Sequence, residues 1–209
     1  MLYSIMKCIY CDHPYTYELS DKQRKCSKCK RKFSPRKVAR EKKLLELFTQ
    51  GVNASKSSKQ TKMHFLTVQK YYDKFRKNIA LYADEMYQYN AQRVTEYDEY
   101  LYLPKSLNID ENIDKLQHFL TMSYEQTIYN IMMPKASRSL LEYKDESSKK
   151  LMIKYLKFNK IAKLCNSQNN ITRFWTYFED FILQYKGVSD EQFIFYLKEA
   201  EWRFNSKFK

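Results

Sequence analysis

The sequence predicts an α+β, multidomain chain, and three observations support this fold class. Four cysteines form two Cys-x-x-Cys pairs within the first 30 residues. The excess positive charge lies in the N-terminal part of the chain. Beyond residue 89 the apolar pattern changes from helical to alternating and then back to helical, which is typical of strands followed by helices. We therefore expect three domains, at residues 1–36, 37–88 and 89–209.

The composition limits the class of protein. Of the 209 residues, 44% are hydrophobic and 16% are aromatic, which is enough for packed cores. No apolar run reaches the roughly 18 residues of a membrane span, and the start, MLYSIMKCIYCDH, lacks a signal-peptide pattern. We therefore expect no membrane partner, a cytoplasmic location and reduced cysteines. With 2 glycines in the chain, a glycine-rich nucleotide loop of the usual form is excluded.

The charge distribution points to a polyanionic partner. Residues 1–80 contain 20 Lys/Arg and 6 Asp/Glu, a net charge of +14, whereas residues 81–209 contain 18 of each. Nucleic acid is the commonest partner of such a basic segment. A basic membrane-surface segment is the alternative, but the N-terminal pattern is not that of an amphipathic anchor.

The two cysteine pairs predict a structural zinc site within residues 1–36. Cys8 and Cys11 are separated from Cys26 and Cys29 by 14 residues. Each Cys-x-x-Cys turn places two thiolates on one side, so two such turns complete a tetrahedral site with Zn–S distances of about 2.3 Å. Disulfides are the alternative, and His13 is expected to be a bystander. Exposed cations beside the second turn are expected to contact DNA phosphates, or else to form a solvated face: Lys28, Lys30, Arg31, Lys32, Arg36 and Lys37.

Residues 37–88 are predicted to form a helix-turn-helix. A helix runs from Val38 to Gln50 and stops at Gly51, a short helix follows Ser55, and a longer helix has Thr67 as its N-cap. This order suits a helix-turn-helix whose recognition helix begins near Thr67, and an ordinary helical bundle is the alternative. The helix would present Thr67, Gln69, Lys70 and Lys74 to a DNA groove, and Arg76 and Lys77 to the DNA backbone.

Residues 89–209 are predicted to contain an antiparallel meander and C-terminal helices. Strands are expected at 94–103 and, as a hairpin, within 118–134. Helices follow at 147–164 and 170–187, and a last helix starts with a capping box at Ser189. Their aromatic stripes are expected to form the core, with Glu179 and Asp180 on a solvated face. Asp98, beside Glu99 in the first strand, is either a metal ligand or part of a solvated edge strand.

Three stretches resemble one group of bacterial insertion-sequence transposases. KCSKCKRKFS resembles the end of that family's zinc ribbon, and TEYDEYLYL resembles its first core strand. SQNNITRFW, followed by VSDEQFIFYLKEAEWRFN, resembles its asparagine-containing helix and its final helix. The resemblance covers nearly the whole chain. It implies a zinc ribbon, a helix-turn-helix and an RNase H-like core that acts on double-stranded DNA.

The resemblance also implies a catalytic set for two Mg²⁺ or Mn²⁺ ions, which activate a nucleophile and stabilise a leaving oxygen. Asp98 would be the first metal ligand, Asn169 matches the family's asparagine, and Asp145 is the candidate for the second acid. The chain departs from the family at Thr172, where a glutamate is typical, and at Ser167, where a histidine is typical. A core strand is also missing or shortened, so we expect a reduced RNase H-like domain.

Three functions remain open. The first is a transposase-family protein of the bacterial nucleoid that binds insertion-element ends, with strand cleavage lost or weakened. The second is an active metal-dependent transposase that uses Asp98, Asp145 and Asn169. The third is a transcriptional regulator derived from a transposase, whose C-terminal domain mediates homo-oligomerisation. RNA is an alternative polyanion, although a helix-turn-helix favours duplex DNA.

Overall fold

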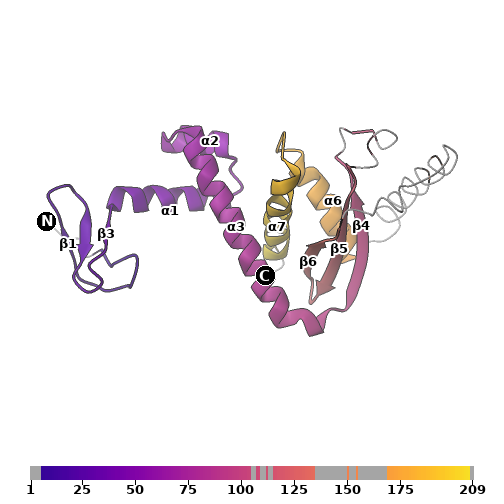
Figure 1. Ribbon diagram of the computed structural model, residues 1–209, viewed down its shortest axis with the longest axis horizontal. Coiled ribbons are helices and arrows are strands. Elements are labelled where there is room, and N and C mark those ends of the chain that lie inside the picture. The colour runs from indigo at the N-terminus through magenta and orange to yellow at the C-terminus, as the bar shows by residue number, and fades with distance from the viewer. Residues whose placement is uncertain are drawn as a thin grey trace. The chain divides into compact units, whose positions relative to one another are not determined.

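The computed structural model describes most of the chain as a mixed α/β protein (Figure 1). Its described residues form helices and two three-stranded antiparallel sheets, as the α+β class predicts. The chain divides into two compact units, Met1–Phe75 and Arg76–Lys209, and the division falls within the long helix α3 (Phe65–Asn90). The described residues are 6–104, 107–108, 112, 115–134, 150, 154 and 169–207.

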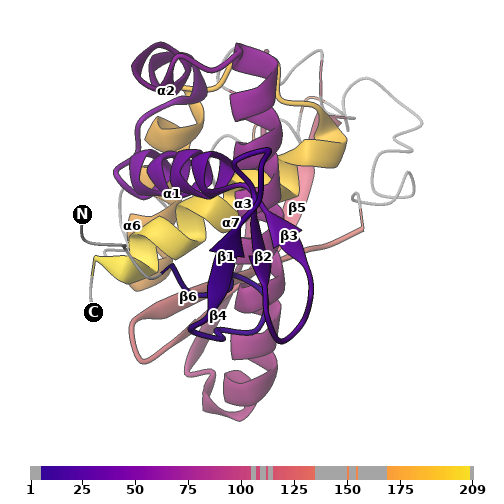
Figure 2. The same ribbon diagram turned by 90° about the vertical axis from the view of Figure 1, so that its left-hand side faces the viewer.

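The first unit begins with a small sheet of three short strands, β1 (Thr16–Glu18), β2 (Arg24–Cys26) and β3 (Lys32–Phe33) (Figure 2). The strands pair in sequence order, and all pairs are antiparallel. Strands of two or three residues bury too little apolar surface to be stable alone. This sheet therefore needs another source of folding free energy.

Two helices follow, and local sequence defines their ends. Helix α1 (Pro35–Thr49) starts at the N-cap Ser34, whose side chain accepts a hydrogen bond from the Lys37 amide. Gly51, with φ of 78°, ends α1 as predicted. Helix α2 (Ala54–Thr61) has Asn53 as its N-cap. These helices confirm the prediction of a long and a short helix.

The predicted start of α3 at Thr67 is wrong. Helix α3 begins at Phe65, and the carbonyl of His64 accepts the amides of Thr67 and Val68 at 2.9 and 3.2 Å. Thr67 therefore lies inside the first turn and cannot act as a cap. A threonine before an apolar run fits a cap by composition, but the chain turns at Lys62, whose φ is 53°.

The first unit has its own helical core. Leu44 and Phe48 of α1 and Val68 and Tyr72 of α3 are all buried. The Phe48 ring packs edge-on against the Tyr72 ring, with 5.0 Å between centroids. The Tyr72 hydroxyl also bonds the buried Ser57 hydroxyl of α2 at 2.6 Å, so it links α2 to α3. These contacts hold α1, α2 and the start of α3 together.

The second unit contains the predicted meander. Strands β4 (Glu96–Tyr102), β5 (Gln117–Tyr124) and β6 (Thr127–Met132) pair antiparallel in sequence order. A short 3-10 helix, η1 (Ala91–Arg93), precedes β4. Glu125 and Gln126, with φ of 45° and 65°, form the β5–β6 turn, and two consecutive positive φ values match the twist of a hairpin.

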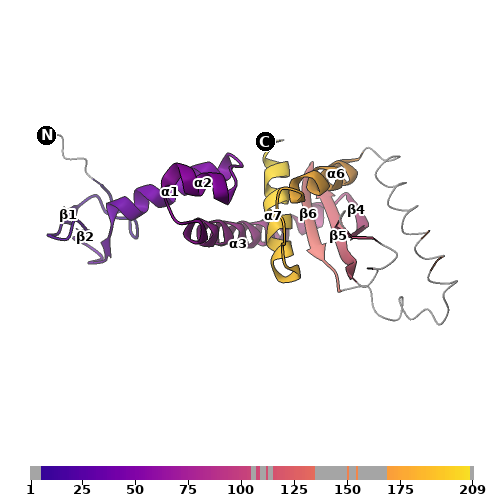
Figure 3. The same cartoon turned by 90° about the horizontal axis from the view of Figure 1, so that it is seen from above.

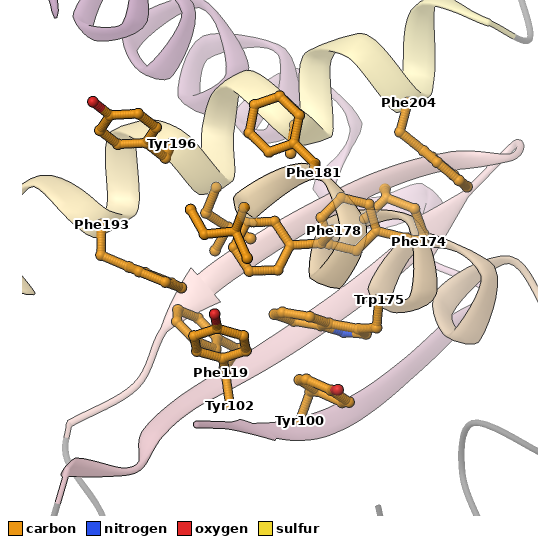
Figure 4. Packing of buried hydrophobic residues seen from close by; sticks show 14 of the residues in the cluster. Tyr100, Tyr102, Phe119, Phe174, Trp175, Phe178, Phe181, Phe193, Tyr196 and Phe204 are labelled. Atoms are coloured by element: carbon orange, nitrogen blue, oxygen red, sulfur yellow. The ribbon is translucent and has the colours of Figure 1, made fainter. Parts of the chain in front are cut away.

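Helices cover both faces of this sheet. Tyr100, Tyr102 and Phe119 pack against α6 (Asn170–Ile182) and α7 (Asp190–Ser206), and Figure 4 shows their rings beside those of the two helices. Figure 3 shows α7 next to the edge strand β6. Met122, Tyr124 and Tyr129 on the opposite face pack against the C-terminal half of α3. The second unit is therefore a three-layer α/β/α arrangement.

Two predicted helix boundaries in the second unit are wrong. Helix α6 ends at Ile182 instead of continuing to Gly187. Ser189 is the N-cap of α7, but its side chain makes no capping hydrogen bond, so the capping box is not formed. The predicted helix at 147–164 lies outside the described residues apart from 150 and 154. Among the described helices, none has both the length and the apolar character for crossing a membrane.

Candidate metal centre and nucleic-acid interface

The four cysteines of the N-terminal module converge on one point. The sulfur atoms of Cys8, Cys11, Cys26 and Cys29 all lie within 4.8 Å of one another. The Cys8–Cys29 and Cys11–Cys26 sulfur distances are 3.6 and 3.7 Å. A disulfide needs about 2.05 Å, whereas four sulfurs at about 2.3 Å from a tetrahedral ion are separated by about 3.8 Å. The predicted cysteine set is confirmed as a cluster that could bind a metal ion.

The two Cys-x-x-Cys turns have the same backbone conformation. Asp12 and Lys30, the residues directly after each pair, have φ of 53° and 61°. The amide of Asp12 bonds the Cys8 carbonyl at 3.0 Å, and that of Lys30 bonds the Cys26 carbonyl at 3.1 Å. Each turn therefore closes in the same way and directs its two sulfurs to the same side.

Backbone amides are placed to stabilise thiolates, the form that binds metal ions. The Cys26 sulfur accepts from the amides of Lys28 and Cys29, each at 3.4 Å. Burial acts to raise the pKa of the Cys26 thiol, but these amides and the neighbouring sulfurs outweigh it and lower the pKa to about 6. The His13 amide acts to lower the pKa of Cys11, but burial and the other sulfurs raise it to about 11.

The predicted DNA-contacting cations beside the metal cluster are all exposed. Four of them lie on the second cysteine turn and β3, and two lie in the first turn of α1. The guanidinium of Arg31 lies 5.2 Å from the centre of the Tyr10 ring, an arrangement that orients the cation. The exposed side chains are Lys28, Lys30, Arg31, Lys32, Arg36 and Lys37.

The start of α3 presents a second set of polar side chains. Thr67, Lys70 and Lys74 are exposed, and their spacing of three and four residues places them along one side of the helix. Gln69 is half-buried. Val68 and Tyr72, on the other side, are buried in the core of the first unit. The helix thus separates a packed side from a basic, solvent-facing side.

Arg76 does not face solvent, contrary to the prediction. Its side chain is 3% exposed, and its Nε lies 2.7 Å from a carboxylate oxygen of Glu199 in α7. Its guanidinium also lies 4.0 Å from the centre of the Tyr196 ring. Lys77 is exposed as expected, with its Nζ 5.7 Å from the centre of the Phe195 ring. The basic side of α3 therefore does not include Arg76.

Asp98 and Glu99 point to opposite sides of the sheet, which explains how one strand accommodates both. Asp98 is half-buried on the face that carries Tyr100, and one of its carboxylate oxygens accepts the Glu99 amide at 2.8 Å. Glu99 is exposed on the other face, where its carboxylate lies 3.2 Å from the His118 ring nitrogen. Asp98 is opposite Thr121 of the central strand β5, so it lies on β4, an edge strand of the described sheet.

Of the other two predicted catalytic residues, the structure describes Asn169 alone. Asn169 is the N-cap of α6, and its side-chain oxygen accepts the Thr172 amide at 2.9 Å. Asp145 lies outside the described residues. Within the described ranges, the cysteines are the only group of three or more His, Cys, Asp or Glu residues placed to hold a metal ion. Catalysis by Asp98, Asp145 and Asn169 therefore stays a prediction.

Glu179 is buried, so its assignment to a solvated face is wrong, whereas Asp180 is exposed as predicted. Glu179 accepts a hydrogen bond of 2.6 Å from the Tyr100 hydroxyl. Burial of Tyr100, reinforced by the nearby carboxylate, raises the pKa of this phenol strongly. The helical pattern could not show this pairing because the two residues are 79 positions apart.

Polar side chains of α7 bind the outer edge of β6. The sequence pattern does not predict this structural role. The side chain of Asn205 accepts the Ile128 amide and donates to the Ile128 carbonyl, both at 2.8 Å. Glu201 accepts the Asn130 amide at 2.9 Å. These bonds satisfy edge groups that would otherwise pair with another strand. The sequence contains one signal for this contact, the run KEAE at residues 198–201. A helix that packs only against apolar surfaces would carry apolar side chains at these positions.

Comparisons with protein-family models, curated proteins and solved structures each return no significant match to this chain. The geometry of the described residues is therefore the basis for assigning a function.

Proposed function

We propose that this chain is a double-stranded DNA-binding protein whose first unit contains a zinc ribbon and a helix-turn-helix. The observation that carries this proposal is the distribution of exposed cations over the metal cluster and the start of α3. Four convergent cysteines are a ligand set that zinc prefers, and a closed site of this kind stabilises a module with no core of its own.

The helical part of the first unit supports this class of protein. Helices α1, α2 and α3 share one core, and the α2–α3 turn is short, with Lys62 in the left-handed conformation. The side of α3 that carries Thr67, Lys70 and Lys74 is solvent-exposed at the N-terminal end of the helix. A recognition helix contacts the major groove through the same end.

The more specific proposal is a transposase by descent that binds insertion-element ends and cuts them poorly or not at all. The antiparallel meander supports a reduced RNase H-like domain, since Asp98 lies in the middle of its first strand. Weak cleavage is consistent with Asn169 acting as a helix cap and with the lack of a carboxylate cluster among the described residues.

One gel experiment tests binding and cleavage together. Labelled duplexes from both flanks of the gene are incubated with the purified protein and Mn²⁺, and retardation and nicking are scored. Retarded but intact DNA supports a protein that binds without cutting. No retardation of either flank contradicts the proposal. Selective binding upstream of unrelated genes instead favours a transcriptional regulator.

A working transposase is the second candidate, and the position of Asp98 favours it. Asp98 is half-buried on the face covered by α6, where Trp175 donates to the opposing Thr121 at 2.9 Å. If the enzyme is active, Asp98→Asn is expected to abolish Mn²⁺-dependent nicking and leave retardation unchanged, because the amide cannot replace a metal-binding carboxylate. Nicking that persists in this variant removes Asp98 from the reaction.

Replacing Lys70 with alanine is expected to weaken duplex binding and to reduce the salt dependence of the affinity. If Lys70 neutralises one phosphate, the slope of log K against log salt concentration falls by about one unit. Binding is measured at several salt concentrations for the wild type and for Lys70→Ala. Lys186→Ala, which removes an exposed lysine of the second unit, serves as the matched control. An unchanged slope in Lys70→Ala excludes this residue from the DNA contact.

A further inference from the structure

One face of the β1–β3 sheet carries exposed aromatic rings next to lysines. Tyr15 and Tyr17 are 68% and 46% exposed, which is high for residues of this size. Tyr17 is opposite Lys25 of β2, and Lys25 is opposite Lys32 of β3, so the three side chains form one row across the sheet. The Tyr15 carbonyl accepts the Ser27 amide at 3.2 Å, which continues the same strand pairing.

The two tyrosines share this face. Tyr15 directly precedes β1 and continues its pairing with β2, and residues two positions apart in such an extended chain point to the same side, about 6.7 Å apart. Glu18 and Arg24 belong to the opposite face, where Arg24 donates to the side chain and to the carbonyl of Thr16 at 2.9 and 2.7 Å. The three strands therefore place aromatic and cationic side chains, and no carboxylate, on the Tyr17 face.

We propose that this face, formed by Tyr15, Tyr17, Lys25 and Lys32, binds single-stranded DNA, an inference that rests on the DNA-binding function proposed above. An aromatic ring on a basic surface stacks on unpaired bases, while the adjacent lysines neutralise phosphates. Bases within a duplex already stack on one another, so stacking on a side chain there requires that the duplex be partly unstacked. The two rings therefore favour an unpaired strand, whereas α3 is proposed to contact duplex DNA.

The test compares two DNA ligands with the full-length, zinc-loaded protein. Fluorescence anisotropy measures the affinity for a labelled oligothymidine and for a labelled duplex. Tyr17→Ala and Tyr15→Ala are each expected to weaken oligothymidine binding about 5-fold or more, since a stacked base contributes about 1–3 kcal/mol. Duplex affinity and zinc content are expected to stay at wild-type values. Tyr17→Trp is expected to restore oligothymidine binding because indole also stacks.

The controls separate this inference from the function on which it rests. Tyr89→Ala removes a tyrosine of the second unit that is 79% exposed, and it is expected to change neither affinity. Wild-type protein that binds duplex but not oligothymidine overturns the inference and leaves the proposed function intact. If Tyr17→Ala lowers the affinity for oligothymidine and for duplex equally, the inference is also overturned. The face would then be part of the duplex contact. Tighter binding of the matching oligouridine overturns the assignment to DNA.

Discussion

Replacing Cys26 with serine is expected to abolish zinc retention and duplex binding together. Cys26 is fully buried, and its sulfur lies 3.7 Å from that of Cys11 within the cluster. A serine hydroxyl is a poor zinc ligand, so the variant loses much of the roughly 10–16 kcal/mol that zinc binding contributes to such modules. No strand of the β1–β3 sheet exceeds three residues, so little else keeps it folded.

The measurement combines zinc content per chain, far-UV circular dichroism and duplex affinity. Helical ellipticity is expected to remain near the wild-type value, because Leu44, Phe48 and Tyr72 form a core that does not include the cysteines. Cys165→Ser is the matched control, since Cys165 lies outside the two Cys-x-x-Cys pairs of the sequence. A Cys26→Ser protein with one zinc ion per chain and wild-type affinity would contradict both the proposed zinc site and its proposed role in DNA binding.

Features encoded locally in the sequence were predicted well. The spacing of Cys8, Cys11, Cys26 and Cys29 defines two tight turns, and such turns need no distant partner to form. The alternation of residues 94–103 likewise predicts a strand, and β4 (Glu96–Tyr102) lies within that range. These predictions succeeded because residues close in sequence determine the backbone geometry.

Features that depend on distant residues were not predictable from pattern. Arg76 lies in a basic segment and was expected to face DNA, but Glu199, 123 positions later, pairs with it in the core of the second unit. The helical pattern predicts that Glu179 faces solvent, whereas this residue accepts a hydrogen bond from the Tyr100 hydroxyl. A helical pattern assigns charged residues to solvent by default, because it contains no information about a partner on another element.

Replacing Glu199 with methionine is expected to destabilise the second unit by about 3–5 kcal/mol, because the change leaves a buried guanidinium without its counter-charge. Glu199 is 1% exposed, and it accepts from Arg76 Nε at 2.7 Å and from Arg203 Nη2 at 2.7 Å. Burial acts to lower the pKa of the Arg76 guanidinium, but Glu199 outweighs it and keeps the group charged. Thermal denaturation is expected to show a melting temperature lower by roughly 10 °C or more.

A double variant distinguishes loss of charge pairing from loss of packing. Arg76→Met combined with Glu199→Met removes both buried charges and is expected to recover much of the lost stability, since apolar side chains of similar size can replace a buried ion pair. Arg203 also loses its partner Glu199 in this variant. It tolerates the loss better than Arg76 would, because the Arg203 side chain is 13% exposed and reaches water. Glu191→Ala, at an exposed site of the same helix, is the control, with an expected change below about 1 kcal/mol. If the two methionine substitutions destabilise additively, the Arg76–Glu199 pair is not a coupled unit, and its burial reflects packing alone.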